Sequence, residues 1–512
     1  MDLRRVWLPI AVLAGLLGLV VALTIAGLTS SSPQTAGSAQ RVTARPAPTA
    51  HSASAASGAH SAATAQLTEW PEFGLNPQRT NATDKSTGIT AANVTKLNLR
   101  RVELPGTADN SPIFLSGVDV DGTVQNVVIV TTIYGITAAI DPASGRILWT
   151  FTPPGIGAWS GTYQITTATP IADSSGQYVY TTSPNGLVHK LSVENGQEAS
   201  GWPVRITVLP AREKLTASLN ISDGELLAST GGYDGDVPPY VGHIVAINLQ
   251  SGQIEHVFNT LCASRHAIIS PPTCSASDSA ILSRSGPVVL RGAKRVLIAT
   301  GNAPWNGTTD FGDSVIELTL PGLKFVQAYT PTDQATLNTS DLDEGSGSPA
   351  LLPGGLALIG GKDGLLRLLD LRHLDGRAKA LPSHTGGQLQ ILPTPGSAML
   401  FSAPAVWHSM VFVADGGGTS AYYLSHRRLH VAWSKSTNGT TPIVAGGLLY
   451  VYDMDSGGLN VYDPRSGRLL TTLASGTGHW NSPIVVDGYV IEPEGDANDH
   501  LTSGVLDIWS AG

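Results

Sequence analysis

The 512-residue sequence contains little charge. Asp, Glu, Lys and Arg together make up 13% of it, whereas Gly occurs 57 times and Pro 33 times. A low charge content argues against long solvent-exposed helices, and abundant Gly and Pro are typical of many short strands joined by turns. The composition therefore favours an all-β fold, and repeated four-stranded units would occupy this length without a second core.

Several catalytic signatures are absent from the sequence. It has no Gly-x-Ser-x-Gly elbow, no Walker-type phosphate loop and no His-Glu-x-x-His zinc motif. It also lacks Cys-x-x-Cys-His, the attachment site of a c-type haem. A hydrolase or lyase that uses acidic residues in a central channel stays open as an alternative, although no motif supports it.

Charge is missing altogether from Trp7 to Leu28, a stretch long enough to span a bilayer as a helix. Arg4 and Arg5 precede it, which favours a cytoplasmic N-terminus and an exported remainder. We predict an uncleaved signal anchor over residues 1–28, with cleavage after Ala39 as the alternative. No cysteine lies near the end of the apolar run, which argues against a lipoprotein.

Residues 29–67 consist almost wholly of Ser, Ala, Thr, Pro, Gly and Gln, so they cannot bury a core. We predict a disordered linker that holds the globular part on the order of 35 Å from the membrane. Residues after 68 carry 26 positive and 38 negative side chains. This acidic balance predicts no binding to nucleic acid or anionic lipid through bulk charge.

The sequence has two cysteines, Cys262 and Cys274. Export would place them where disulfides persist, so we expect them to be bonded to each other. Closing so short a loop would contribute about 3 kcal/mol in the chain-entropy account. The alternative is two free buried thiols.

A unit recurs from Ser111 onward: a small residue and Pro, an apolar strand, a turn, a second strand, and a third strand that ends at a Gly-containing turn. About eight copies are present, and their starts lie at Ser111, Thr169, Leu219, Gly286, Ser348, Ala403, Thr441 and Ser482. Because no unit can bury both faces of its sheet alone, radial stacking into a ring is expected. We predict one eight-bladed β-propeller of four-stranded antiparallel blades over residues 68–512.

The last unit has sequence for only three strands before the chain reaches Gly512. Residues 97–104 (LNLRRVEL) read as an isolated strand ahead of the first unit. We predict that residues 99–104 pair with residues 505–509 and so close the ring.

The segment AAIDPASGRILWTF, which ends at Phe151, resembles the repeat of pyrroloquinoline-quinone (PQQ) enzymes, in which a Trp locks neighbouring blades; that residue here is Trp149. The lead-in EWPEFGLNPQRTNAT, followed by GITAANVTKL, is similar to that of quinoprotein alcohol dehydrogenases. The resemblance covers most of residues 68–512. It implies a site at one mouth of the propeller channel, with PQQ beside a Ca²⁺ or lanthanide ion.

Four positions match the motifs of that family. The stretch GNAPWN makes Asn302 the implied amide ligand of the metal. The stretch NTSDLDEGS makes Asp341 the implied catalytic base and Asp343 the additional carboxylate of lanthanide-type members. Lys362, in GGKDG, falls where the family places a cation against the quinone oxygens. Each also has a simpler explanation as a residue of a polar turn.

Other family features are missing. No two cysteines are adjacent, and Ile281, Leu282 and Ser283 replace the Trp beneath the quinone. A metal-binding Glu is expected before VGHIVAIN, where GGYDGDVPPY offers only Asp234 or Asp236. Without a haem motif, electrons would leave through an external acceptor.

These observations leave two main hypotheses for function. The first is a membrane-anchored, extracytoplasmic quinoprotein-like propeller that acts as a binding or assembly module for a cell-surface protein or a small molecule, with a partly decayed cofactor site. The second is an active PQQ- and Ca²⁺- or lanthanide-dependent dehydrogenase of alcohols or sugars. The sequence favours the first slightly, because of the missing features.

Overall fold

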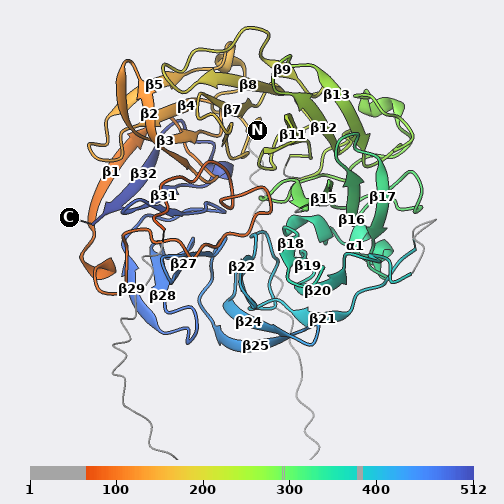
Figure 1. The fold of residues 1–512 in the computed structure, drawn as a ribbon. Coiled ribbons are helices and arrows are strands. Elements are labelled where there is room, and N and C mark those ends of the chain that lie inside the picture. Colours follow the sequence, from red (N-terminus) through yellow and green to blue (C-terminus); the bar gives the residue numbers. More distant parts are fainter. Residues whose placement is uncertain (1–64, 234, 291, 293, 378–383, 512) are drawn as a thin grey trace, which may run out of the picture. The chain divides into compact units, whose positions relative to one another are not determined.

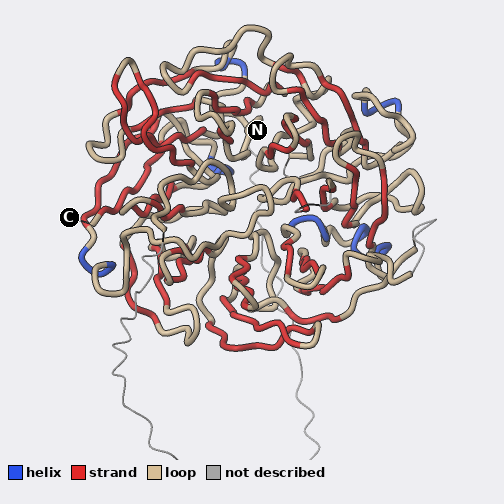
Figure 2. The backbone as a smooth tube through the Cα atoms, in the orientation of Figure 1, coloured by secondary structure: helices blue, strands red, loops and turns tan. Residues whose placement is uncertain are grey.

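The computed structural model describes residues 65–511, except 234, 291, 293 and 378–383. Their strands form eight four-stranded antiparallel sheets, arranged as the blades of a ring (Figure 1). Figure 2 shows that nearly all the regular structure of the ring is strand, with a few short helical turns in its loops. The predicted all-β propeller of eight antiparallel blades is therefore confirmed.

The first four blades lie between residues 113 and 329. Blade 1 contains β2 to β5 (Ile113–Val120, Thr123–Thr131, Thr137–Ile140, Ile147–Phe151), and blade 2 contains β6 to β9 (Ile171–Ala172, Tyr178–Ser183, Leu187–Ser192, Val204–Arg205). Blade 3 contains β10 to β13 (Asn220–Ser222, Glu225–Ser229, His243–Asn248, Ile254–Asn259), and blade 4 contains β14 to β17 (Val288–Leu290, Arg295–Ala299, Val315–Thr319, Phe325–Tyr329).

The remaining blades follow in chain order. Blade 5 contains β18 to β21 (Ala350–Leu352, Leu356–Gly360, Leu365–Asp370, Gln390–Pro393), and blade 6 contains β22 to β25 (Ala405–Trp407, Met410–Ala414, Thr419–Ser425, Arg428–Lys435). Blade 7 contains β26 to β29 (Ile443–Ala445, Leu448–Tyr452, Leu459–Tyr462, Leu469–Leu473). Blade 8 combines β30 to β32 (Ile484–Val486, Tyr489–Glu494, Gly504–Ser510) with β1 (Asn98–Leu104).

The short helices lie in connections between strands. They are α1 (Gln334–Thr339) and the 3₁₀ turns η1 to η5 (Val94–Lys96, Ile156–Ala158, Pro271–Thr273, Glu344–Ser346, Ala497–Asp499). Within the described residues, no helix is both long and apolar enough to cross a bilayer. The predicted anchor (1–28) and nearly all of the predicted linker (29–67) lie outside the described residues.

The ring closes as the sequence predicts. Strand β1 pairs antiparallel with β32, with Leu99 opposite Trp509 and Leu104 opposite Gly504. Both ends of the propeller therefore share one blade. The expected bond between Cys262 and Cys274 is also present, as a disulfide.

Neighbouring blades are locked by tryptophans, as the resemblance implies. The indole of Trp149, in β5, donates from Nε1 to the Val193 carbonyl of the next blade at 2.8 Å. The ring also packs on Gly196, where an added Cβ would lie 2.5 Å from it. Gly196 has φ +72°, so this turn requires glycine for both its conformation and its space.

The lead-in segment crosses one end of the ring (Figure 1, red-orange). Its backbone carbonyls accept hydrogen bonds from the innermost strands of several blades, at Phe114, Ala172, Val289, Val406 and Val444. Arg79, fully buried, anchors the segment through Glu72 at 2.6 Å and the Leu219 carbonyl at 2.5 Å. This end is therefore covered, and the connections that carry the predicted site residues lie at the other end.

Candidate functional site

The residues predicted from the sequence converge from three consecutive blades. Asp236 lies between β11 and β12, Asn302 between β15 and β16, and Lys362 between β19 and β20, while Asp341 and Asp343 lie in the connection from blade 4 to blade 5. Carboxylate oxygens of the three aspartates all lie within 4.8 Å of one another. Residues separated by more than 100 positions in the sequence thus form one acidic cluster.

Asn302 is held in a defined orientation within this cluster. Its backbone N–H donates to Asp343 Oδ1 at 2.6 Å, and its side-chain Nδ2 donates to Asp341 Oδ1 at 2.7 Å. The side-chain oxygen Oδ1 is buried without a hydrogen-bond partner. A buried amide oxygen beside three carboxylates is the kind of ligand set that hard cations such as Ca²⁺ prefer.

Gly301 makes this arrangement possible. An added Cβ at this position would lie 2.2 Å from Asp343 Oδ1. Since no Cβ tolerates such a distance, the backbone before Asn302 can approach Asp343 only where the residue is glycine.

Lys362 contributes the positive charge of the cluster. Its Nζ lies 2.8 Å from Asp341 Oδ1 and 2.6 Å from Asp343 Oδ2. Burial lowers the pKa of Lys362, but the charges of Asp343 and Asp341 outweigh this and raise it above its ordinary value. With all three aspartates ionised, one ammonium leaves two negative charges for a metal ion to neutralise.

Asp236 occupies the position where the missing Glu was expected. It accepts a hydrogen bond from the Tyr240 hydroxyl at 2.7 Å. Burial raises the pKa of Asp236 to about 6, and the negative charges of Asp343 and Asp341 act in the same direction. The other candidate, Asp234, lies outside the described residues.

A cavity of about 300 Å³ opens beside the cluster. Besides Lys362 it is lined by two further cations, Lys214 and Arg284, and by the aromatic side chains of Phe401 and Trp480. Phe401 and Trp480 are stacked, with ring centroids 4.8 Å apart. The cavity thus combines cationic, aromatic and acidic side chains, which suits a small planar anion bound next to a metal.

Sequence reasoning did not identify Arg284, Phe401 or Trp480, although their positions follow a rule. Each lies four residues before the first residue of an innermost strand, as do Thr167, Thr216 and Ser346. All six line the cavity. In most blades the recurring small residue and Pro begin two residues before the innermost strand. The lining position, two residues further back, could therefore have been predicted from the repeat.

Asp109 occupies the same position in blade 1 and supports the lining from beneath. It is fully buried and lies 3.2 Å from Arg284 Nη2 and 2.7 Å from His479 Nδ1. Burial raises the pKa of Asp109, but Arg284 and His479 outweigh this and hold it well below the ordinary value. Asp109 is therefore an ionised carboxylate that fixes two residues of the cavity wall.

The structure shows two departures from the quinoprotein pattern, one in the cavity wall and one in the disulfide. Leu282 lines it where the sequence comparison expected a Trp, so this wall is apolar without an extended ring to stack. The disulfide joins Cys262 to Cys274 rather than two adjacent cysteines, and neither cysteine lines the cavity.

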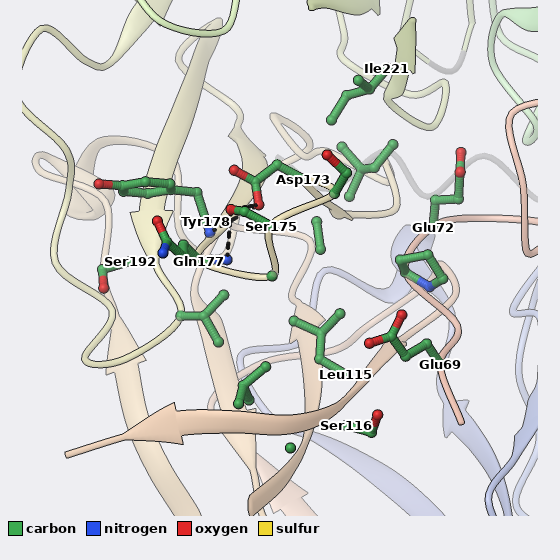
Figure 3. A pocket seen from close by; sticks show the side chains of 18 of the residues that line it. Glu69, Glu72, Leu115, Ser116, Asp173, Ser175, Gln177, Tyr178, Ser192 and Ile221 are labelled. Atoms are coloured by element: carbon green, nitrogen blue, oxygen red, sulfur yellow. Dashed lines mark hydrogen bonds between the residues drawn. The ribbon is translucent and has the colours of Figure 1, made fainter. Parts of the chain in front are cut away.

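A larger groove of about 830 Å³ lies toward the end of the ring that the lead-in segment covers (Figure 3). Glu69 and Asp173 line it, but Asp173 accepts a hydrogen bond from Ser175 at 2.7 Å within its own turn. The groove is polar, and its lining contains neither the three close aspartates nor the buried unpartnered amide oxygen found at the other mouth. We therefore assign the candidate site to the smaller cavity.

Comparison with solved structures identifies the fold. The chain has the eight-bladed propeller of quinohemoprotein alcohol dehydrogenase from Comamonas testosteroni (TM-score 0.64, 15% identity, covering 88% of this chain and 82% of that one). It is also similar to a europium-containing methanol dehydrogenase (TM-score 0.62, 14% identity, 86% and 98%). BamB from Moraxella catarrhalis matches as well (TM-score 0.51, 13% identity, 81% and 98%).

The comparisons thus show a β-propeller whose fold is similar to that of these two dehydrogenases. No protein-family model and no curated protein sequence matches the chain. At these identities the likeness concerns the fold, and the function has to be argued from the site itself.

Proposed function

We propose that the open mouth of the propeller binds a divalent or trivalent metal ion together with PQQ, and that the protein is a dehydrogenase of alcohols or sugars. The observation that carries this proposal is the buried, unpartnered Oδ1 of Asn302, held among Asp236, Asp341 and Asp343. A metal ion would give this buried oxygen a bond and would neutralise the charge of the neighbouring carboxylates.

The residues present fit both groups. Asn302 Oδ1 and carboxylate oxygens of Asp236 and Asp343 would hold the metal, since all are hard oxygen ligands, and Asp341 would lie beside it. Lys362, Arg284 and Lys214 would face the carboxylates of PQQ, and Leu282 with Trp480 would contact its ring. When bound, PQQ would supply a two-electron acceptor and the metal ion a Lewis acid.

Asp341 is the residue placed to accept the proton of a substrate hydroxyl. Its Oδ1 is engaged by Asn302 and Lys362, whereas its side chain is 67% exposed. The hydrogen bonds and the ion pair to Asn302 and Lys362 both use Oδ1, which leaves Oδ2 for a substrate hydroxyl. The fixed Oδ1 contacts orient the carboxylate, which is what a general base needs.

The experiment is a titration of the purified protein with PQQ and CaCl₂ or LaCl₃, followed by tryptophan fluorescence, because Trp480 lines the cavity. Reduction of an artificial dye by primary alcohols and sugars then measures turnover. We expect saturable binding that Asn302→Ala weakens at least tenfold, and turnover that Asp341→Asn abolishes. Asp333→Asn, an exposed aspartate of the same interblade connection, is the matched control.

A second candidate is a binding or assembly module with a decayed site. Leu282 in place of the expected Trp and the lack of an adjacent cysteine pair favour it. Absence of PQQ binding at micromolar concentration in the presence of metal would select this candidate and refute the dehydrogenase.

The disulfide further supports an extracytoplasmic location, because such bonds persist in oxidising compartments. We propose that residues 1–28 anchor the propeller to the membrane. Fractionation of cells expressing the full chain and a chain lacking residues 1–28 tests this, and recovery of both in the soluble fraction would contradict it.

A further inference from the structure

A second cavity lies next to the mouth cavity, which is the cavity of the candidate site. This side cavity has a volume of about 360 Å³. Its walls come from the connections between β5 and β6, β9 and β10, β11 and β12, and β31 and β32. Three residues, Lys214, Tyr233 and Asn498, line both cavities. A ligand in the side cavity would therefore lie beside the candidate site, although none of the three clustered aspartates lines the side cavity.

Hydrogen bonds join these connections in pairs. The Tyr134 hydroxyl lies 3.1 Å from the Thr162 carbonyl oxygen and 3.0 Å from the His500 carbonyl oxygen, which links the connection after β5 to the one after β31. The Tyr233 hydroxyl donates to the Pro210 carbonyl at 2.9 Å and links the connection after β11 to the one after β9. The side cavity is therefore built into the fold, as small-molecule sites usually are.

One part of the side cavity is apolar and aromatic. Tyr163 and Tyr233 meet edge to face with their ring centroids 5.5 Å apart, and Ile165 lines the cavity with them. Two of the apolar lining residues are only partly covered, since Tyr163 is 53% exposed and Val237 is 46% exposed. Such a wall suits the ring of a bound aromatic molecule, which would remove both side chains from water.

The Lys and Arg side chains of the side cavity face no lining carboxylate. Arg212 and Lys214 line it, whereas no Asp or Glu of the described chain does. The half-buried guanidinium of Arg212 forms no hydrogen bond or ion pair with the described residues. Because the propeller as a whole is acidic, this local positive charge distinguishes the cavity and favours an anion. A guanidinium can bind a carboxylate through two parallel N–H groups.

We propose that the side cavity binds a small aromatic carboxylate, with its ring against Tyr163 and Tyr233 and its carboxylate on Arg212. A neutral aromatic molecule would lack the ion pair, and an inorganic anion would lack the ring contact. This site goes beyond the proposed dehydrogenase, because it requires neither PQQ nor a metal ion.

The first test is calorimetric titration of the purified full chain, without PQQ or added metal, using benzoate and its neutral analogue benzamide. We expect benzoate to bind saturably and benzamide to bind at least fivefold more weakly. Arg212→Gln should weaken benzoate binding at least fivefold and leave benzamide binding unchanged. Arg428→Gln, at an exposed position of β25, is the matched control and should leave both affinities unchanged.

The second test locates the ligand with 4-azidobenzoate, an aromatic carboxylate that forms a covalent bond to its surroundings under light. Tyr163 and Val237 line the side cavity but not the mouth cavity, whereas Phe401 and Trp480 line the mouth cavity but not the side cavity. Mass spectrometry of peptides should find the label on those that contain Tyr163 or Val237. Excess benzoate and the Arg212→Gln substitution should each reduce this labelling.

Three results would overturn the proposal: no benzoate binding at millimolar concentration, equal benzoate affinities in Arg212→Gln and the unmodified protein, or label confined to peptides that contain Phe401 or Trp480. Equal affinities for benzoate and benzamide would also exclude recognition of the carboxylate. Failure of the proposed dehydrogenase would be recognised separately, because every measurement is made without PQQ.

Discussion

The candidate site depends on single residues whose contacts are specific. Gly301 brings the backbone against Asp343 Oδ1, where an added Cβ would lie only 2.2 Å away. Asn302 then uses its N–H and its amide to hold Asp343 and Asp341. The geometry of the proposed metal ligands therefore rests on a residue that carries no ligand atom.

We expect Gly301→Ala to weaken metal binding at the mouth at least tenfold while the propeller still folds. The methyl group would push Asp343 away and disturb Asn302. Isothermal titration with Ca²⁺ or La³⁺ measures the affinity. Gly416→Ala is the control, because nothing lies within 4 Å of its added Cβ, and equal affinities in both variants would contradict the argument.

Leu282 lines one wall of the cavity and, in the proposed site, would set how much ring surface PQQ contacts there. Leu282→Trp should tighten PQQ binding about two- to tenfold, since an aromatic contact contributes roughly 0.5–1.5 kcal/mol beyond its area. Fluorescence titration measures the change, and Leu282→Met controls for apolar volume without a ring. Weaker PQQ binding by Leu282→Trp than by the unmodified protein would show that this wall has no room for an indole ring.

The sequence predicted the acidic cluster but not the cavity around it. Asp341, Asp343, Asn302 and Lys362 lie in motifs with local spacing, so a resemblance can find them. Arg284, Phe401 and Trp480 each stand alone in different blades and meet only through closure of the ring. Local sequence patterns do not encode which residues meet across a ring. They do encode that these three residues lie at the same distance in sequence from the innermost strand that follows each of them.

At the scale of elements, the blade-to-blade contact through Trp149 is the clearest packing device. The indole is 8% exposed, covers Gly196 and donates to the Val193 carbonyl. The same arrangement recurs at Trp433, which packs on Gly467 and donates to the Pro464 carbonyl at 3.0 Å. Such contacts hold successive blades in register.

Trp149→Ala should lower the free energy of unfolding by about 3–5 kcal/mol, because it opens a cavity and leaves a buried carbonyl unpaired. Denaturant unfolding at a fixed protein concentration measures the loss. The exposed Arg146 of the preceding turn provides the control, and Arg146→Ala should change the value by less than about 0.5 kcal/mol. A similar loss of unfolding free energy in both variants would show that the Trp149 contact does not stabilise the propeller.

At the scale of the whole molecule, β1 closes the ring by joining the sheet that contains the last three strands. Val102 in β1 is 6% exposed and packs in the core that contains strands of blades 1, 7 and 8. Closure was predictable because the last repeat lacks one strand and the segment at residues 97–104 has no other partner. The course of the lead-in segment was not predictable, because irregular backbone carries no periodic signal.

Val102→Asp should therefore destabilise the entire propeller by several kcal/mol, since it buries an unpaired charge in the closing strand. Limited proteolysis and the unfolding midpoint measure the effect. Asn98→Asp, at an exposed position of the same strand, is the control. If only the N-terminal segment becomes protease-sensitive while the midpoint is unchanged, β1 does not hold the ring together.

The buried pair of Glu72 and Arg79 makes stability depend on pH in a defined direction. Burial raises the pKa of Glu72 from 4.5 to about 7, against the opposing attraction of Arg79. Between those two values the folded protein keeps a proton that the unfolded chain has lost, so stability should rise as the pH falls from 8 to 5.

Unfolding of wild type and Glu72→Gln at both pH values isolates this group, because Gln does not titrate. The stability of wild type relative to the variant should be greater at pH 5 than at pH 8. If the stability of wild type relative to Glu72→Gln is instead greater at pH 8 than at pH 5, Arg79 keeps Glu72 ionised. The ion pair then outweighs the cost of removing both charges from water.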